Sequence, residues 1–588
     1  MLRRTLFVAL LLYSMSSIAS EKPWTEVRSQ HFRVLTNGST SDAVKVVREF
    51  EQMRWVFATR FPNARLDSGA PLTVFAVRDE ATAKQLDPIM WKRMGSWLAG
   101  AFHHGWEKEY AMVRLDTFGG EGSKEVVYHE YTHSILRLNS HWLPLWLNEG
   151  WAEFYGFTRF EAHRVYLGAP TERYRALRRK TPMSVQYLIS LRRLPEDEEA
   201  FYVQSWALVH YLTYGQGMGN GRKMDQFFAL LQEAKPQEKA FQEVFGDFQT
   251  VDKGFDAYLQ QPSYEASILR DPPQIDEKSI TLRPLSIAET EAELGGFHLW
   301  TRDLKAARPL LEDAIKSDPK LGLAHEDIGF LDFAEGKDTE ASGEFEQAHA
   351  LDNKLYLSQF ARTMMSPLAA SNKVQDMNTL GGELGKVLQV NPLFSSAYVQ
   401  LAILAYREGD FPTALMISRK AEELEPSLAG YHLLSGQILL RTGKNAGAAD
   451  AARFVADRWI GPDHNEAVEL WNRVPLAERT GDALSAVPLK DTEAVEGRVK
   501  TITCSENDQD FSLVLEQGGH SLTFHRKGLF PVGFSDTIWY GGDHFNHCHH
   551  IEGLRAIVHY HTSGDASYAG DIVELELRND LPEPLKTP

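Results

Sequence analysis

Hydrophobic positions in the first part of the chain follow strand and helix periods in turn. Residues 24–37 have the pattern of two short strands, and residues 71–77 that of a buried strand. Residues 42–61 instead place apolar side chains at helical spacing. Residues 98–104 and 109–116 are expected to form a hairpin. Together these elements predict a small α/β scaffold.

The middle of the chain repeats with a period of 34. Small residues recur at matching positions: Gly295, Ala307, Ala314 and Pro319 return as Gly329, Ala341, Ala348 and Asn353, and Ala402, Ala414, Ala421 and Pro426 as Gly436, Ala448, Val455 and Ile460. This is the tetratricopeptide repeat (TPR) signature, in which paired helices approach closely because the contact residues are small. Four repeats are clear, and residues 356–390 carry a degenerate fifth with a five-residue insertion. Such a solenoid either offers a concave surface to a peptide or protein partner or only supports the neighbouring domain.

The last hundred residues change to a period of two, which predicts a small antiparallel β domain, sandwich or barrel. Six segments carry the pattern: 497–504, 510–516, 520–526, 537–540, 554–561 and 571–578. Cys504 and Cys548, the two cysteines of the chain, lie here and are expected to form a disulfide, given the export argued below. The histidine-rich segment 543–550 allows a second metal site by ligand type, although a polar loop is the default expectation.

Composition and the amino terminus bear on location and partners. The chain has 588 residues, 43% of them hydrophobic, and a formal charge of −18, which disfavours a nucleic-acid partner. Residues 1–20 have two arginines, a short apolar run and small residues at Ala19 and Ser20, the pattern of a cleaved signal peptide. No later stretch has the length of a membrane span. We therefore expect an exported, periplasmic or secreted protein.

The motif HEYTH carries the candidate chemistry. His129 and His133 are four residues apart, so on a helix both imidazoles reach one point, as zinc requires. Glu149, in a second and aromatic-rich helix, is the natural third ligand. Glu130 is placed to take a proton from the bound water. Glu153 is placed to accept the other ring N–H of His129 and so fix the orientation of that imidazole. The alternative is an ordinary amphipathic helix whose histidines are packed or solvated.

HEYTH followed by WLNEGWAE resembles the gluzincin metallopeptidases. The resemblance implies the same three zinc ligands, the same general base, and a second carboxylate at Glu153. One departure is the connection of 15 residues between His133 and Glu149, which is shorter than in the better-known branches. The segment 201–212 is similar to the family helix whose tyrosine stabilises the oxyanion. This alignment nominates Tyr202, with His210 as its rival.

The hairpin before the zinc helix bears on how substrate binds. In gluzincins the corresponding edge strand pairs with extended substrate, so the resemblance implies such pairing for residues 110–115. His103, His104 and Glu107 in this hairpin are expected to be solvated turn residues, with the cleft rim as the alternative. The aminopeptidase branch has an acidic motif here that grips a free amino terminus. AGAFHHG does not match it, which disfavours an exopeptidase.

The sequence thus predicts a multidomain α+β chain. We expect a signal peptide at 1–20, a zincin-like metallopeptidase domain at 21–265, an α-helical TPR solenoid at 285–473 and a small all-β domain at 489–588. The leading function is a Zn²⁺-dependent peptidase acting on a peptide or protein substrate. The alternatives are a TPR-mediated protein-binding scaffold that retains the peptidase fold, and a zinc hydrolase of a non-peptide amide.

Overall fold

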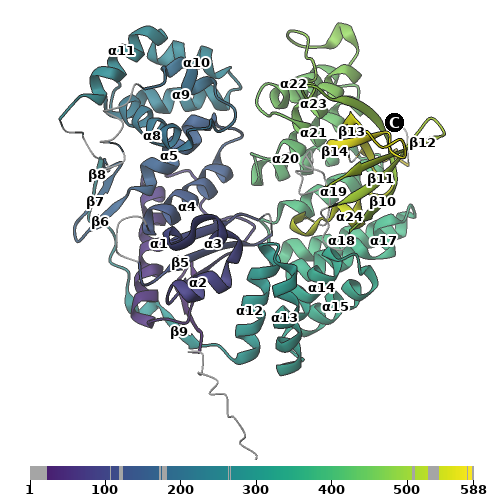
Figure 1. Cartoon of the computed structure of the whole chain (residues 1–588), viewed down its shortest axis with the longest axis horizontal. Coiled ribbons are helices and arrows are strands. Elements are labelled where there is room, and N and C mark those ends of the chain that lie inside the picture. The colour runs from purple at the N-terminus through teal and green to yellow at the C-terminus, as the bar shows by residue number, and fades with distance from the viewer. Residues whose placement is uncertain are drawn as a thin grey trace, which may run out of the picture.

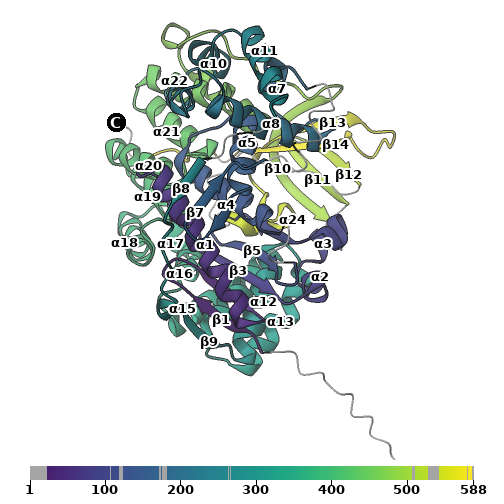
Figure 2. The ribbon, with the colours of Figure 1, turned by 90° about the vertical axis from the view of Figure 1, so that its left-hand side faces the viewer.

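A computed structural model describes residues 23–105, 107–117, 123–170, 174, 182–262, 264, 267–505, 510–527, 542–578 and 580–585. The chain is mostly helical and forms two halves that face each other across a gap between the ribbons (Figure 1). The amino-terminal half ends where the repeat helices begin at residue 287, and these helices continue into the half that also holds the carboxy-terminal sheet (Figures 1 and 2). The expected signal peptide lies outside the described residues.

A six-stranded mixed sheet forms the base of the first half, in the order β4-β5-β3-β2-β1-β9. Its strands are β1 (Thr25–Arg28), β2 (Arg33–Thr36), β3 (Leu72–Val77), β4 (Gly100–His103), β5 (Glu109–Arg114) and β9 (Thr281–Pro284). β2, β3 and β5 run parallel, whereas β4 is antiparallel to β5. The expected strands and the hairpin are confirmed.

The edge of this sheet differs from the expectation. β5 pairs with β3 on one side and with β4 on the other, with Met112 opposite both Phe75 and Ala101. The prediction that residues 110–115 pair with substrate is therefore wrong, because their main-chain groups are already used within the sheet. β4 forms the edge instead. At the opposite edge, β9 lies beyond residue 265 yet pairs with β1, so the chain returns to the first sheet before the repeats begin.

Helices cover this sheet and extend the first half. They are α1 (Thr40–Arg60), α2 (Glu80–Leu86), α3 (Pro88–Met94), α4 (Ser123–Asn139), α5 (Leu145–Gly156), α7 (Val185–Ser190), α8 (Glu198–Tyr214), α9 (Arg222–Gln232), α10 (Gln237–Phe245) and α11 (Phe248–Leu259). A small antiparallel sheet adds β6 (Arg159–Glu161), β7 (Arg164–Leu167) and β8 (Ser267–Arg270). One continuous core joins α1, the sheet and α4 to α11, with Phe50, Trp146 and Phe241 fully buried.

The repeat region consists of helix pairs, as the 34-residue period predicts. The pairs are α12 (Ile287–Trp300) with α13 (Leu304–Ser317), α14 (Gly322–Ala334) with α15 (Asp338–Leu351), α19 (Ser395–Arg407) with α20 (Phe411–Leu424), and α21 (Ala429–Arg441) with α22 (Asn445–Ala456). The recurring alanines Ala307, Ala341, Ala414 and Ala448 are fully buried. A Cβ at Gly329 would lie 2.7 Å from the Phe345 ring, so this close helix contact requires glycine. The TPR part of the prediction is confirmed.

The degenerate fifth repeat occupies the expected residues. α16 (Tyr356–Met365) is followed by one short turn, α17 (Pro367–Ala370), and then by α18 (Val374–Val390). The insertion is therefore accommodated as a break around Pro367 between the two helices of the pair. A last helix, α23 (Pro462–Arg473), closes the solenoid.

The carboxy-terminal residues form a closed barrel in the order β10-β11-β12-β14-β13. Its strands are β10 (Glu493–Cys504), β11 (Phe511–Gln517), β12 (His520–Arg526), β13 (Arg555–Thr562) and β14 (Gly570–Arg578). A short parallel pairing of β12 with β14 closes it, so the sheet is not wholly antiparallel. The segment 537–540, expected to be a strand, lies outside the described residues. The expected disulfide is confirmed: it joins Cys504 at the end of β10 to Cys548 in α24 (His547–His550), with Cα atoms 5.9 Å apart.

None of the helices within the described residues combines the length and the apolar character that crossing a bilayer requires.

Candidate metal centre

Two close-packed helices carry the candidate metal ligands. α4 holds the HEYTH motif and α5 holds NEGWAE. A Cβ at Gly156 would lie 3.3 Å from the Cβ of His129, and one at Gly150 only 2.6 Å from the Ser205 carbonyl of α8. Glycine at both positions lets α4 and α8 approach α5 from either side. The ligand carboxylate of α5 is thereby brought against the histidines of α4.

The three expected ligand atoms converge. Nε2 of His129 and Nε2 of His133 are 3.1 Å apart, and the Glu149 carboxylate oxygen lies 3.4 Å and 3.3 Å from them. A tetrahedral ion bound at 2.0–2.1 Å sets its ligands about 3.3 Å apart. The spacing therefore fits Zn²⁺ with three protein ligands.

Groups behind the imidazoles fix their orientation. Glu153 lies 3.5 Å from Nδ1 of His129, and the Asn148 side-chain oxygen 3.3 Å from Nδ1 of His133. With both Nδ1 atoms donating, both Nε2 atoms present lone pairs to the same point as the Glu149 carboxylate. Three acceptors facing one another are electrostatically unfavourable unless a cation lies between them, which supports the metal assignment. The sequence indicated Glu153 for this position but gave no reason to select Asn148.

Charge in the site favours an ionised ligand. Burial alone would raise the pKa of the Glu149 carboxyl, but the contacts with the imidazoles of His129 and His133 lower it to about 2. Glu149 is therefore a carboxylate at neutral pH, as zinc ligation requires.

Glu130 faces the same pocket and has a partner that the sequence did not reveal. Its carboxylate lies 3.3 Å from Nε2 of His104, whose Nδ1 lies 3.4 Å from Glu109. Arg137 in turn donates to Glu109 at 3.0 Å. Burial raises the pKa of Glu130, but the contact with His104 and the neighbouring histidines brings it below its usual value. Glu130 is therefore a carboxylate at neutral pH and faces the candidate ligands across the pocket.

The other hairpin residues are not solvated as expected. Nε2 of His103 lies 2.7 Å from the Asp87 carboxylate. Glu107 is buried, and its backbone amide donates a hydrogen bond to the Asp543 carboxylate of the carboxy-terminal domain. The solvated-turn prediction is wrong for Glu107, because the hairpin turn is covered by another domain. His104 lies at the pocket, as the alternative had it.

The two candidates for the oxyanion lie in different places on α8. Tyr202 lines the pocket, with its ring centroid 6.2 Å from that of His129. Burial and the nearby carboxylates raise the pKa of Tyr202 to about 12, so its hydroxyl keeps its proton at neutral pH. His210 is fully buried and lies 2.7 Å from the Tyr258 hydroxyl, away from the pocket lining. Tyr202 is thus the candidate that the fold brings to the ligands.

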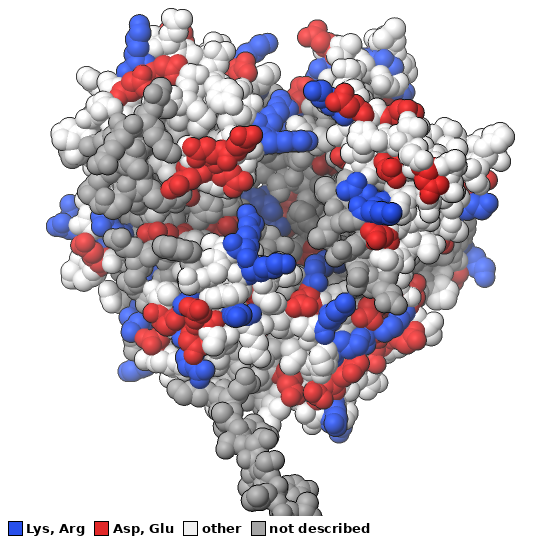
Figure 3. All heavy atoms as spheres, viewed as in Figure 1, with Lys and Arg blue, Asp and Glu red and all other residues white. Residues whose placement is uncertain are grey.

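The pocket over the ligands has a volume of about 530 Å³ and is walled by both halves of the molecule. Trp142 and Leu143 of the first half line it together with Ser427 and Trp459, which precede α21 and α23 of the repeats. The space-filling view shows a hollow between the two halves with lysine and arginine side chains at its margins (Figure 3). The sequence gave no indication that the repeats contribute to this pocket.

The histidine-rich segment does not gather into a second ligand set of the kind that its residue types allowed. His544 packs between Trp300 and Phe330, at ring distances of 4.1 Å and 4.7 Å, and His550 stacks on Phe333. Among the described residues the one further group with metal-ligand spacing is Cys504, His547 and Cys548, whose sulfurs form the disulfide. The segment docks the barrel onto the repeats rather than forming a polar loop.

No protein-family model matches the chain, and no curated protein matches it either. The similar solved structures are helical repeat proteins. PilF of Pseudomonas aeruginosa is 16% identical over 32% of this chain and 83% of its own, with a TM-score of 0.28. PilW, a type IV pilus biogenesis factor, is 16% identical over 33% and 88%, with a TM-score of 0.28. YrrB, a TPR protein with an unusual peptide-binding site, is 18% identical over 31% and 90%, with a TM-score of 0.25.

Structural similarity at such low TM-scores does not indicate a function for this chain. The TPR architecture rests on the helix pairs and their buried alanines.

Proposed function

We propose that the chain is a zinc-dependent peptidase. The observation that carries the proposal is the convergence of His129, His133 and Glu149 within 3.1–3.4 Å of one another, at the floor of a pocket that Glu130 also lines. These three residues would hold Zn²⁺, which when bound would supply polarisation of a carbonyl and a bound water with a pKa of about 7.

The chain's own residues supply the remaining chemistry. Glu130 accepts the proton of the attacking water and passes it to the leaving amine, and His104 holds that carboxylate in place at 3.3 Å. Tyr202, protonated at neutral pH, donates to the oxygen of the attacked carbonyl. Glu153 and Asn148 keep both imidazoles turned toward the reacting centre.

The sheet edge favours a peptide over a small amide as substrate. Within the described residues β4 pairs with β5 alone, and His104, which follows β4, reaches the pocket. An extended peptide adding to this edge pairs main chain to main chain and passes beside Glu130. A hydrolase of a small non-peptide amide has no need of such an edge.

A second candidate is a protein-binding scaffold, favoured by five helical repeats in one chain. Glu130→Gln separates the two functions. Wild-type protein, the Glu130→Gln form and an exposed control, Glu161→Gln, would be loaded with zinc and incubated with a diverse peptide library, with and without chelator. We expect Glu130→Gln to keep its zinc and lose about 10²–10⁴-fold in cleavage rate, and Glu161→Gln to match wild type. If all three proteins cleave the peptides equally, or if none of them does, the peptidase proposal is refuted and the protein-binding scaffold is the function that remains.

A further inference from the structure

The last described residues of the chain lie on the repeats. After β14, residues 580–585 extend across α19 and α21. Leu581 packs against an apolar cluster that includes Tyr406 and Ile438. Further along, the Leu585 amide donates to the Arg407 carbonyl at 2.9 Å, and Glu583 forms an ion pair with Arg441. This segment is thus held by one apolar anchor, one main-chain hydrogen bond and two ion pairs, that of Glu583 with Arg441 and that of Asp580 with Arg555.

A groove of about 940 Å³ opens beside this segment. Its walls come from α19, α21 and α23, from the barrel, and from residues 580–583. Arg441, Arg473 and Arg498 line it. In the described part of the chain, Arg473 has no carboxylate partner, and Arg498 donates only to the Gly553 carbonyl. The groove therefore presents more positive charge than its own carboxylates neutralise.

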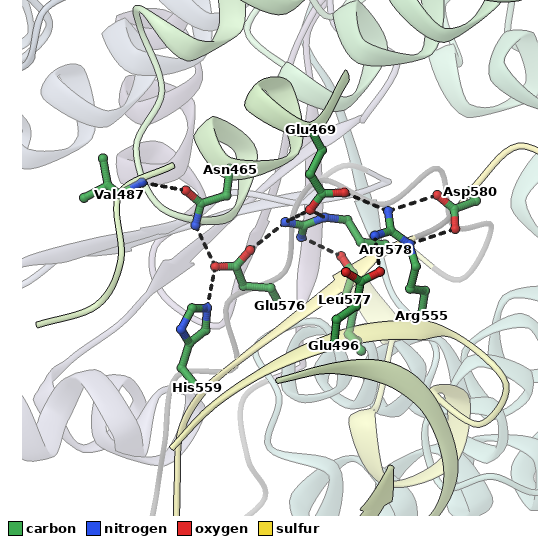
Figure 4. Close-up of polar contacts among 10 residues, drawn as sticks. All are labelled: Asn465, Glu469, Val487, Glu496, Arg555, His559, Glu576, Leu577, Arg578 and Asp580. Atoms are coloured by element: carbon green, nitrogen blue, oxygen red, sulfur yellow. Dashed lines mark hydrogen bonds and ion pairs between the residues drawn. The ribbon is translucent and has the colours of Figure 1, made fainter. Parts of the chain in front are cut away.

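The base of the groove is rigid. Glu469 of α23 accepts from Arg578 at 3.1 Å and from Arg555 at 2.9 Å, and Arg555 also donates to Asp580 at 3.0 Å (Figure 4). Arg578 is almost fully buried and is also bonded to Glu576 at 2.6 Å. This network fixes the barrel on α23 and sets the point at which the segment enters the groove.

The sequence of the segment, DLPEPL, matches the groove in chemistry. Its two acidic residues face the arginines, and Pro582 and Pro584 favour an extended backbone that lacks two amide donors. The two ion pairs that hold it are modest, because Glu583 is 83% exposed and Asp580 is 41% exposed, and exposed ion pairs contribute little. A weakly held segment is displaced easily, even though its covalent attachment gives it a high effective concentration.

We propose that the surface beneath residues 580–585, together with the groove beside it, binds an extended acidic peptide with leucine before proline, presented by a protein partner, and that residues 580–585 cover this surface as an internal competitor. Leu581 marks the apolar subsite beside Tyr406. Arg441 and Arg555, which pair with Glu583 and Asp580, mark the acidic subsites, and Arg473 lines the same groove. The partner's segment takes the place of the chain's own, and the pocket over His129, His133 and Glu149 is not required.

Binding of a fluorescent DLPEPL peptide to the full chain tests the proposal. Wild type would be compared with Leu581→Ser/Glu583→Lys, which unseats the internal segment, and with that variant carrying Arg441→Glu and Arg473→Glu. We expect the unseated variant to bind the peptide at least tenfold more tightly than wild type, and the charge-reversed variant to lose this gain. A DSPEPS peptide, which lacks both leucines, is the control and should bind none of the three proteins. Melting curves would verify that each variant is folded.

Hydrogen exchange in the wild-type chain gives a second measure that needs no variant. Saturating peptide should release the Leu585 amide from Arg407 and speed its exchange, whereas DSPEPS should not. The proposal is overturned if no folded variant binds at millimolar peptide, if both peptides bind alike, or if binding leaves Leu585 exchange unchanged.

Discussion

Replacing Glu153 with glutamine tests whether the carboxylate behind His129 tunes the metal site. Glu153 is buried and lies 3.5 Å from Nδ1 of His129, so the substitution removes a charge while keeping the side-chain shape. Loss of such an outer partner typically lowers metal affinity 10–100-fold, which corresponds to about 1.4–2.7 kcal/mol. We expect a smaller loss for Asn148→Ala, because the amide oxygen beside His133 carries no formal charge.

The assay is a competition titration against a chromophoric zinc chelator at fixed pH and ionic strength. Glu161→Gln, which is exposed on β6, serves as the matched control and should bind zinc as wild type does. If Glu153→Gln binds zinc within threefold of wild type, the carboxylate does not orient His129, and the assignment of the imidazole tautomers is refuted.

Three further predictions concern stability. Lys108→Met leaves the buried Asp327 without its partner at 2.8 Å and should cost about 3–5 kcal/mol in denaturant unfolding, with partial recovery in Lys108→Met/Asp327→Asn. The hydrogen bond to Glu344 raises the pKa of His325 above its ordinary value of about 6.5. This pair therefore stabilises the fold fully below about pH 6.5, and its contribution is lost as the pH rises through the pKa of the folded state. Glu344→Gln should flatten the corresponding slope of unfolding free energy against pH. Reducing the disulfide, which spans 44 residues, should destabilise the barrel by roughly 4 kcal/mol, seen as a lower melting temperature that the Cys504→Ser variant reproduces without reductant.

Local pattern was enough to predict most elements of the fold. The 34-residue period located the helix pairs, because small residues at helix contacts leave a regular mark in the sequence. HEYTH placed two candidate ligands on one helical face, and Glu149 in the next helix was the natural third candidate, as the resemblance also implied. Features that depend on long-range pairing were not predicted. The sequence of β9 alone resembles an exposed linker, and only its pairing with β1 shows that it is a strand of the first sheet. Residues 110–115 likewise cannot be recognised as an inner strand without knowing that β3 lies beside them.

The same limit applied to the site. His104 reaches Glu130 only because the hairpin bends back over α4, and its sequence neighbourhood gave no sign of this. The sequence around Asn148 shows only a helix residue, and the contact of its side-chain oxygen with His133 is visible only in the fold. The alignment nominated Tyr202 with His210 as its rival, and the structure separates the two because His210 is buried against Tyr258. Ser427 and Trp459 belong to a different domain of the sequence altogether.

The two halves are tied at more than one point. Lys108 is bound to Asp327, and Arg192 donates to the Asp457 carbonyl at 3.2 Å, so residues far apart in the sequence join the two halves at separate places. Under the proposed peptidase function, such ties would keep the opening to the pocket at a constant width. Such an opening would admit an extended, unfolded stretch of polypeptide and exclude a folded domain. Local unfolding of the target protein, or the presence of a flexible loop in it, would then limit the rate of cleavage.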